Sequence, residues 1–119
     1  MHHMVSAKRE SLITQMRRGT LEYCVLALLR DQARYGFDLA RTLAAADGLV
    51  TSEATIYPLL SRLRRDGLVT TSWRESPSGP PRRYYELTPA GHQALEVFAT
   101  EWDRFTQAVD RLLQQGEGS

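Results

Sequence analysis

The last quarter of this 119-residue chain carries a small or apolar residue at alternating steps of four and three positions. Such steps put all of these side chains on one stripe of a helix, the heptad seam through which coiled-coil helices pair. Thr88 and Pro89 are typical of a helix start, so a helix is predicted over 89–115. Too little chain remains to cover this stripe, and a second copy of the chain is its expected partner. The stripe comprises Gly91, Leu95, Phe98, Trp102, Phe105, Val109 and Leu112.

A second amphipathic segment, over 8–18, is expected to support the same interface because it carries apolar residues at helical spacing. Dimerisation is therefore assigned to residues from both ends of the chain, namely Leu12, Ile13, Met16, Leu95, Phe98, Trp102, Phe105, Val109 and Leu112. Residues 1–7 are expected to form a disordered, tag-like start, since His2 and His3 are typical of a tag remnant. These two histidines enter no metal-binding hypothesis.

Helical and strand-like patterns follow one another between these two segments. Apolar residues at helical spacing predict helices over 21–29, 36–46 and 53–66. Residues 68–73 and 82–87 are β-prone, and the Pro- and Gly-rich stretch between them predicts a hairpin with a long loop. The expected fold is mainly α with a two-stranded β-hairpin. It consists of a winged helix-turn-helix domain over 8–88 and a C-terminal dimerisation helix over 89–115.

The third of these helices carries small, polar and basic residues opposite its apolar stripe. On a helical wheel, Ala54, Pro58, Ser61 and Arg65 lie opposite Ile56, and Thr55, Tyr57 and Arg62 flank them. A helix of this kind can enter the major groove of DNA, which is about 12 Å wide. Thr51 and Ser52 are predicted to cap the helix and to donate hydrogen bonds to DNA. With Ser52 as the cap, Pro58 lies beyond the first turn, so either the helix starts later or it bends there.

Arginines gather around the predicted hairpin. Residues 62–85 hold six basic and two acidic residues, whereas residues 86–119 hold two basic and six acidic ones, although the whole chain has a net charge of only +1. A basic hairpin beside a basic helix is the electrostatic footprint of a phosphate-backbone binder. The predicted DNA-binding residues are Thr51, Ser52, Thr55, Tyr57, Pro58, Ser61, Arg62, Arg65, Arg74, Gly79, Arg82 and Arg83.

Several segments resemble the PadR family of transcriptional regulators, over roughly residues 12–105. The resemblance implies a dimeric winged-helix repressor that acts on its own or a neighbouring promoter, and the single C-terminal helix is similar to the smaller subfamily. It maps the family's tyrosine–proline pair onto Tyr57 and Pro58, which makes Tyr57 the first choice for a phosphate contact. Tyr35 stands where the family often has histidine. The segments are GTLEY (19–23), YGFDL (35–39), SEATIYPLLSRL (52–63), DGLV (66–69) and PRRYYELTPAG (81–91).

The resemblance also implies a ligand site. In some relatives, aromatic residues of the last helix line a cavity at the dimer centre that takes flat hydrophobic molecules. Phe98, Trp102 and Phe105 are the matching residues in this chain. Ordinary interface packing is the alternative interpretation of these three aromatic side chains.

Other functional classes find little support. His92 has no Cys or Ser partner in the pattern, and the chain has no zinc spacing, P-loop or dinucleotide motif, so neither an enzyme nor a cofactor or metal site is expected. No apolar run approaches the roughly 20 residues of a membrane span, and a cytoplasmic location is expected. The lone Cys24 is interpreted as a buried small hydrophobe. Two alternatives stay open: a winged helix used only for protein contact, and a DNA-binding sensor controlled by a small molecule.

Overall fold

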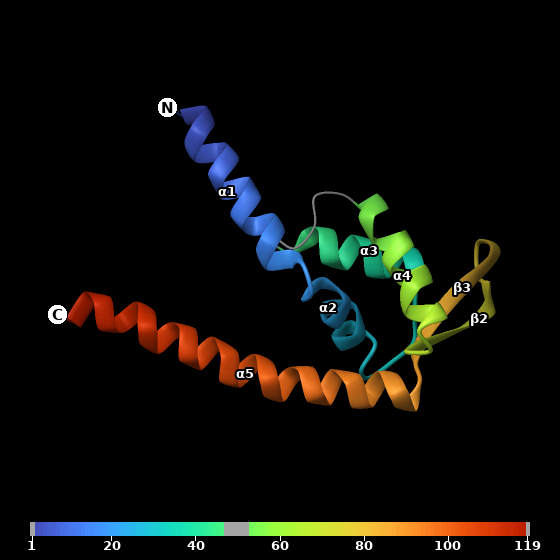
Figure 1. Ribbon diagram of the computed structural model, residues 1–119. Coiled ribbons are helices and arrows are strands. Elements are labelled where there is room, and N and C mark those ends of the chain that lie inside the picture. The colour runs from blue at the N-terminus through green and yellow to red at the C-terminus, as the bar shows by residue number, and fades with distance from the viewer. Residues whose placement is uncertain (1, 47–52, 119) are drawn as a thin grey trace.

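The computed structural model describes residues 2–46 and 53–118, and the side chains over 7–46 and 53–115. A winged-helix body forms the centre, and two long helices extend from it (Figure 1). In chain order the elements are α1 (His2–Arg17), α2 (Leu21–Leu28), β1 (Arg34–Tyr35), α3 (Gly36–Ala45), the 3₁₀ turn η1 (Glu53–Thr55), α4 (Ile56–Arg65), β2 (Val69–Ser76), β3 (Gly79–Leu87) and α5 (Pro89–Gly118). The predicted fold class is confirmed, with one strand added.

The core lies where the apolar stripes of α2, α3 and α4 meet. Leu26, Leu39 and Leu60 are completely buried there, and Ile56 and Leu63 are buried beside them. Each such side chain contributes about 1.5–3 kcal/mol through the surface that it removes from water. The base of the sheet and the first turns of α5 close the core, which fixes α4 with its opposite face outward.

The sheet has three antiparallel strands in the order β1–β3–β2. The hairpin of β2 and β3 was predicted, but its long loop was wrong: the strands continue to Ser76 and Gly79, which pair with each other, and only residues 77–78 connect them. The strand β1 was not predicted, because two residues are too few to show an alternating pattern. Tyr35 of β1 pairs with Tyr84 of β3. The side chain of Arg34 holds this edge in place, since its Nε donates to the carbonyl of Leu28 (2.9 Å) and its Nη1 lies 3.1 Å from Asp38 Oδ2.

The helix α4 begins at Ile56, after the turn η1, rather than at Glu53 as predicted. Pro58 therefore lies in the first turn, where a missing N–H costs no helical hydrogen bond. The later start, and not a bend, explains how this proline is accommodated. At the other end Gly67 has a φ of +77°, and the N–H of Leu68 donates to the carbonyl of Leu63 (3.0 Å), which forms a Schellman motif.

Both terminal helices leave the body on the same side (Figure 1). The helix α1 starts at His2, so it runs through residues 2–7, which were expected to be disordered; that expectation is corrected. The helix α5 starts at Pro89, as predicted, with the N–H of Gly91 donating to Thr88 Oγ1 (3.0 Å). Leu95 of α5 is 5% exposed and belongs to the core of its own chain, so its side chain has little surface left to contact a partner.

Candidate nucleic-acid interface

The outward ridge of α4 consists of the residues that face away from the core. Pro58, Ser61 and Arg65 are exposed along it, and Tyr57 is 43% exposed at its side. The ring of Tyr57 lies against the backbone of Gly36, because a β carbon built on Gly36 would be 3.4 Å from Tyr57 Cε1. The start of α3 therefore supports this ring while part of it stays in contact with solvent.

A groove of roughly 360 Å³ separates this ridge from the hairpin. This wing-side groove is lined by Ser61, Arg64, Arg65, Arg83 and Tyr85, and no acidic residue is among the described residues that line it. The guanidinium of Arg83 lies 5.0 Å from the ring centre of Trp73 in a cation–π contact. Three arginines thus face one hollow from two elements, α4 and β3.

The other two arginines of the hairpin lie on the opposite face of the sheet. Arg74 and Arg82 are directly paired across β2 and β3, one step out of phase with the pair Trp73 and Arg83, and neighbouring residues of a strand point to opposite faces. Arg82 lies 4.5 Å from the ring centre of Tyr35. The sequence grouped Arg74, Arg82 and Arg83 as one basic wing, whereas the fold divides them between two faces.

Arg74 is engaged more fully than Arg82. Its guanidinium lies 4.6 Å from the ring centre of Tyr84, and its Nη2 lies 4.0 Å from Glu86 Oε2. Both members of this ion pair are about half exposed, so the pair contributes little to stability. The carboxylate of Glu86 nevertheless reduces the positive charge on this face of the hairpin.

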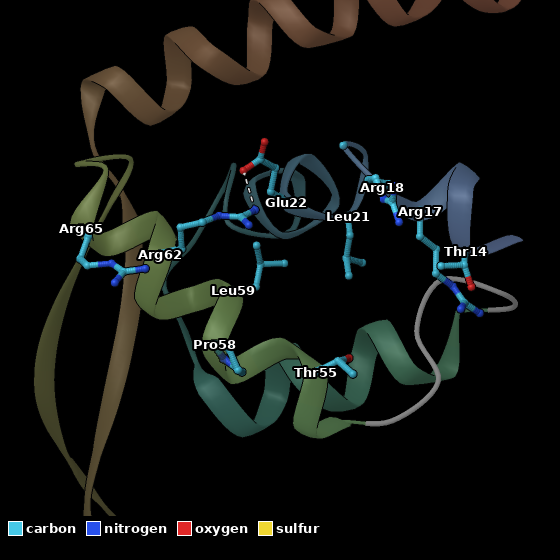
Figure 2. Close-up of a pocket in the computed structure, with 11 residues that line it drawn as sticks. Thr14, Arg17, Arg18, Leu21, Glu22, Thr55, Pro58, Leu59, Arg62 and Arg65 are labelled. Atoms are coloured by element: carbon cyan, nitrogen blue, oxygen red, sulfur yellow. Dashed lines mark hydrogen bonds and ion pairs between the residues drawn. The ribbon is translucent and has the colours of Figure 1, made fainter. Parts of the chain in front are cut away.

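A pocket of roughly 580 Å³ lies on the other side of α4, and we call it the α1-side pocket. Its walls come from the end of α1, the start of α2 and the flank of α4 (Figure 2). Figure 2 shows Arg17 and Arg18 at one end and Arg65 at the other, with Arg62 and Glu22 between them. Arg62 Nη2 lies 3.2 Å from Glu22 Oε2. Glu22 is the one acidic residue among the described residues that line this pocket.

The remaining predicted DNA-binding residues are distributed around these features. Thr55 and Pro58 line the α1-side pocket, and Gly79 is exposed at the start of β3. Thr51 and Ser52 lie outside the described residues. Sequence reasoning missed Arg64, because on a helical wheel it lies only about 80° from Ile56 and so looks half-buried.

The exposed part of the predicted dimer stripe begins at Trp102. We call the set Trp102, Phe105, Val109 and Leu112 the α5 stripe; these residues are 45%, 63%, 37% and 69% exposed. Phe98 is partly covered, because its ring stacks on Tyr23 of α2 with centres 4.1 Å apart and planes 5° apart. On α1, Leu12 and Met16 are exposed and Ile13 is half-buried.

The described residues also bear on the requirements of a metal site, a membrane span and a reactive cysteine. Over residues 2–46 and 53–118, no three His, Cys, Asp or Glu side chains gather in a way that could hold a metal ion. Within the same residues no helix has the length and apolar character needed to cross a membrane. Cys24 is half-buried rather than fully buried as predicted, and it packs against the core. This burial raises the pKa of its thiol above the usual value.

The three helices α2, α3 and α4, with α4 presenting a basic face outward, and the basic hairpin define a winged-helix protein of the DNA-binding type. The model of the PadR-like family of transcriptional regulators matches residues 25–97. The chain therefore belongs to the PadR-like family of transcriptional regulators.

Solved structures agree with this assignment. A PadR-like regulator from Bacillus cereus is 36% identical, with 84% of this chain and 97% of that chain covered and a TM-score of 0.77. A PadR family regulator from Eggerthella lenta is 33% identical, with 93% and 96% covered and a TM-score of 0.78. Bacillus subtilis PadR, solved in complex with operator DNA, is 28% identical, with 68% of this chain and 47% of that chain covered and a TM-score of 0.59.

Proposed function

We propose that this protein is a transcriptional repressor that binds a roughly palindromic operator as a homodimer, with α4 in the major groove and the hairpin on the adjacent backbone. The observation that carries the proposal is the wing-side groove, where Arg64, Arg65 and Arg83 face one hollow without an acidic neighbour among the described lining residues. Bacillus subtilis PadR, which was solved in complex with operator DNA, supports DNA as the partner.

The exposed residue types of α4 support base reading as well as charge neutralisation. Ser61 and Arg65 lie on the ridge that would face base edges, and Tyr57 offers a hydroxyl beside it. The ten residues of α4 span about 15 Å at 1.5 Å per residue, enough to follow a few base pairs along the groove. Thr51, Ser52, Thr55 and Gly79 remain proposed contacts from the sequence.

The homodimer is proposed from exposed apolar surface at both ends of the chain. The α5 stripe presents two aromatic and two aliphatic residues at heptad spacing, and Leu12 and Met16 of α1 are also exposed. Contiguous apolar surface of this kind marks interaction sites. Two copies paired through α5 would present two α4 helices to half-sites about 34 Å apart. Leu95 and Phe98 would then hold α5 in position for pairing, because Leu95 packs in the core and Phe98 stacks on Tyr23.

A flat hydrophobic effector at the dimer centre is a second part of the proposal. Trp102 lies 5.6 Å from Phe98 in a stacked arrangement, and Phe105 is exposed one turn further along α5. Planar aromatic compounds should quench the fluorescence of Trp102 and weaken operator binding. The Trp73→Phe variant should keep this quenching and Trp102→Phe should lose it. Quenching that survives in Trp102→Phe, or that leaves operator binding unchanged, would refute the effector role.

Selection of binding sites from random duplex DNA tests the main proposal. We expect enrichment of one inverted repeat whose half-sites are about 10 base pairs apart, with an affinity that falls steeply with salt. A reporter with the selected operator across its promoter should lose expression when the protein is present. Enrichment of no motif together with salt-independent binding would instead favour the protein-contact module. The cytoplasmic location and the absence of catalysis expected from the sequence remain part of the proposal.

A further inference from the structure

The ridge of α4 lies between two hollows, and both are lined by arginines. The wing-side groove lies along one flank, and the α1-side pocket lies along the other. Arg65 lines both of them, so this one side chain lies between the two hollows. The proposed function uses the wing-side groove, and it leaves Arg17 of α1 and the following Arg18 without a role.

The dimensions of DNA suggest what the second hollow receives. A helix with its side chains is about 10–12 Å across and the major groove is about 12 Å wide, so a helix in the groove has one sugar–phosphate backbone on each side. We propose that the α1-side pocket holds the backbone of the strand that the hairpin does not reach. This inference rests on the proposed function, because it requires α4 to lie in the groove.

The charge and shape of the pocket fit a phosphodiester. Arg17, Arg18, Arg62 and Arg65 surround it, and Glu22 is the one opposing charge among its described lining residues. Guanidinium groups bind phosphate oxygens through paired N–H donors, which strengthens and orients the contact. Leu21 and Leu59 also line the pocket and offer an apolar surface against which a sugar can pack. The end of α1 thereby becomes part of the DNA-binding surface.

Glu22 regulates this site through Arg62. Without DNA, the carboxylate of Glu22 accepts a hydrogen bond from Arg62 Nη2 at 3.2 Å (Figure 2). The side chain of Arg62 is 53% exposed, so it can turn from this partner to an incoming phosphate, while Glu22 is only 24% exposed and stays at the wall. Glu22 therefore competes with DNA for Arg62 and repels the phosphate as well. We infer that it limits the affinity for every DNA sequence.

The experiment compares Arg18→Gln and Glu22→Gln with the natural chain on the selected operator and on random duplex, over a range of salt concentrations. Binding constants fall with salt, and each lost phosphate contact makes the plot of log K against log salt less steep by about 0.9. In a dimer, Arg18→Gln should therefore make the plot less steep by about 1.8. Affinity should fall by a similar factor for both duplexes, because phosphate contacts carry no sequence information. Glu22→Gln should raise the affinity for both duplexes and steepen the slope.

Two charge-matched variants control for overall electrostatics. Arg30→Gln and Glu96→Gln change exposed residues beside His92 on the far part of the body, and both should leave the slope unchanged. Thermal unfolding of all four variants checks that none has lost its fold. Hydroxyl-radical footprints show which DNA strand each arginine contacts. Arg18→Gln should lose protection on one backbone beside each half-site, and Arg83→Gln should lose protection on the other.

The outcomes separate this inference from the function on which it rests. A natural chain that binds no duplex would overturn the proposed function itself. Operator binding that depends on Arg65 and Arg83 but has the same slope and the same footprint in Arg18→Gln would overturn the α1-side pocket alone. An affinity of Glu22→Gln no higher than that of Glu96→Gln would overturn the competition by Glu22.

Discussion

Gly91 packs directly against the backbone of Leu68: a β carbon built on Gly91 would overlap the carbonyl oxygen of Leu68. The same oxygen accepts a hydrogen bond from the N–H of Thr88 at 3.1 Å. The hydroxyl of Thr88 in turn donates to the carbonyl of Gly67 at 2.6 Å. These contacts fasten the start of α5 to the turn that follows α4, and so they fix where α5 leaves the winged-helix body.

Gly91→Ala should therefore destabilise the protein by about 2–3 kcal/mol, because backbone atoms cannot yield to the added methyl group as a flexible side chain could. Urea unfolding at a fixed protein concentration measures the loss, since the stability of a dimer depends on concentration. Gly79→Ala is the matched control: nothing lies within 4 Å of its built β carbon, and it should change the stability by less than about 0.5 kcal/mol. Equal stability of the two variants would contradict the close packing of Gly91 on Leu68.

Gly91 also marks how far the sequence could predict the fold. Its place in the heptad spacing assigned it to the stripe of α5, but its actual neighbour is Leu68 of its own chain. Leu95 was assigned in the same way and lies in the core. Periodicity identifies which residues share a helix face, whereas the surface that covers each turn of that face depends on tertiary contacts. The helices and the hairpin were predictable because their periods and breakers are local.

Arg83→Gln should weaken operator binding more than Arg82→Gln, although the two residues are neighbours in sequence. Arg83 faces Arg64 and Arg65 across the wing-side groove, while Arg82 lies on the opposite face over Tyr35. Loss of one phosphate contact lowers the salt slope by about 0.9 per protomer, so Arg83→Gln should reduce it by about 1.8 and Arg82→Gln by less. Fluorescence-anisotropy titrations at several salt concentrations measure both. A larger effect of Arg82→Gln would assign the DNA-facing side of the hairpin to the other face.

The candidate site was predictable only in part for the same reason. A loop rich in arginine indicates a basic wing, but the strand register decides which arginines share a face, and the sequence leaves the register open. Arg18 and Glu22 come near α4 only through the packing of α1 and α2, which no motif records. Thr51 and Ser52 were chosen as the cap of a helix beginning at Glu53, whereas α4 begins at Ile56. Both lie outside the described residues, so they stay predicted contacts.

Tyr57→Phe should reduce operator affinity without reducing stability. The ring packs on Gly36 and the substitution keeps the ring, so the packing is retained. The hydroxyl is the proposed phosphate donor, and a lost hydrogen bond to a charged group costs about 1.5–3 kcal/mol, which is roughly a 10- to 150-fold loss of affinity per contact. Isothermal titration calorimetry and thermal unfolding measure the two quantities side by side. Unchanged affinity would remove Tyr57 from the set of phosphate contacts.

The pKa of Cys24 leads to a prediction about alkaline pH. Burial raises this pKa, so the folded state keeps the proton that the unfolded chain loses above about pH 8.5. The unfolded state then binds fewer protons than the folded one, and stability falls as the pH rises from the usual thiol pKa to the raised one. Cys24→Ala should unfold with a smaller dependence on pH between about 8 and 10. In the natural chain, iodoacetamide should react with Cys24 more slowly before unfolding than after it.

Phe105→Glu should separate the proposed dimer, because it places a charge in the middle of the α5 stripe. Phe105 is 63% exposed in the single chain, so the substitution leaves the fold of the body intact. In the dimer the same position is enclosed, and burying an unpaired carboxylate costs several kcal/mol. Analytical ultracentrifugation at micromolar concentration should find the variant as a monomer with a normal helical circular-dichroism spectrum.

Val97→Glu is the matched control for this separation. Val97 is also on α5 and is 58% exposed, yet it lies about 100° around the helix from Phe98, off the stripe. The substitution of Val97 should leave the dimer unchanged. Phe105→Glu should lose tight operator binding as well as the dimer, since one protomer contacts only one half-site. If both variants stay dimeric, the chains pair through another surface, and the exposed residues Leu12 and Met16 of α1 become the next positions to test.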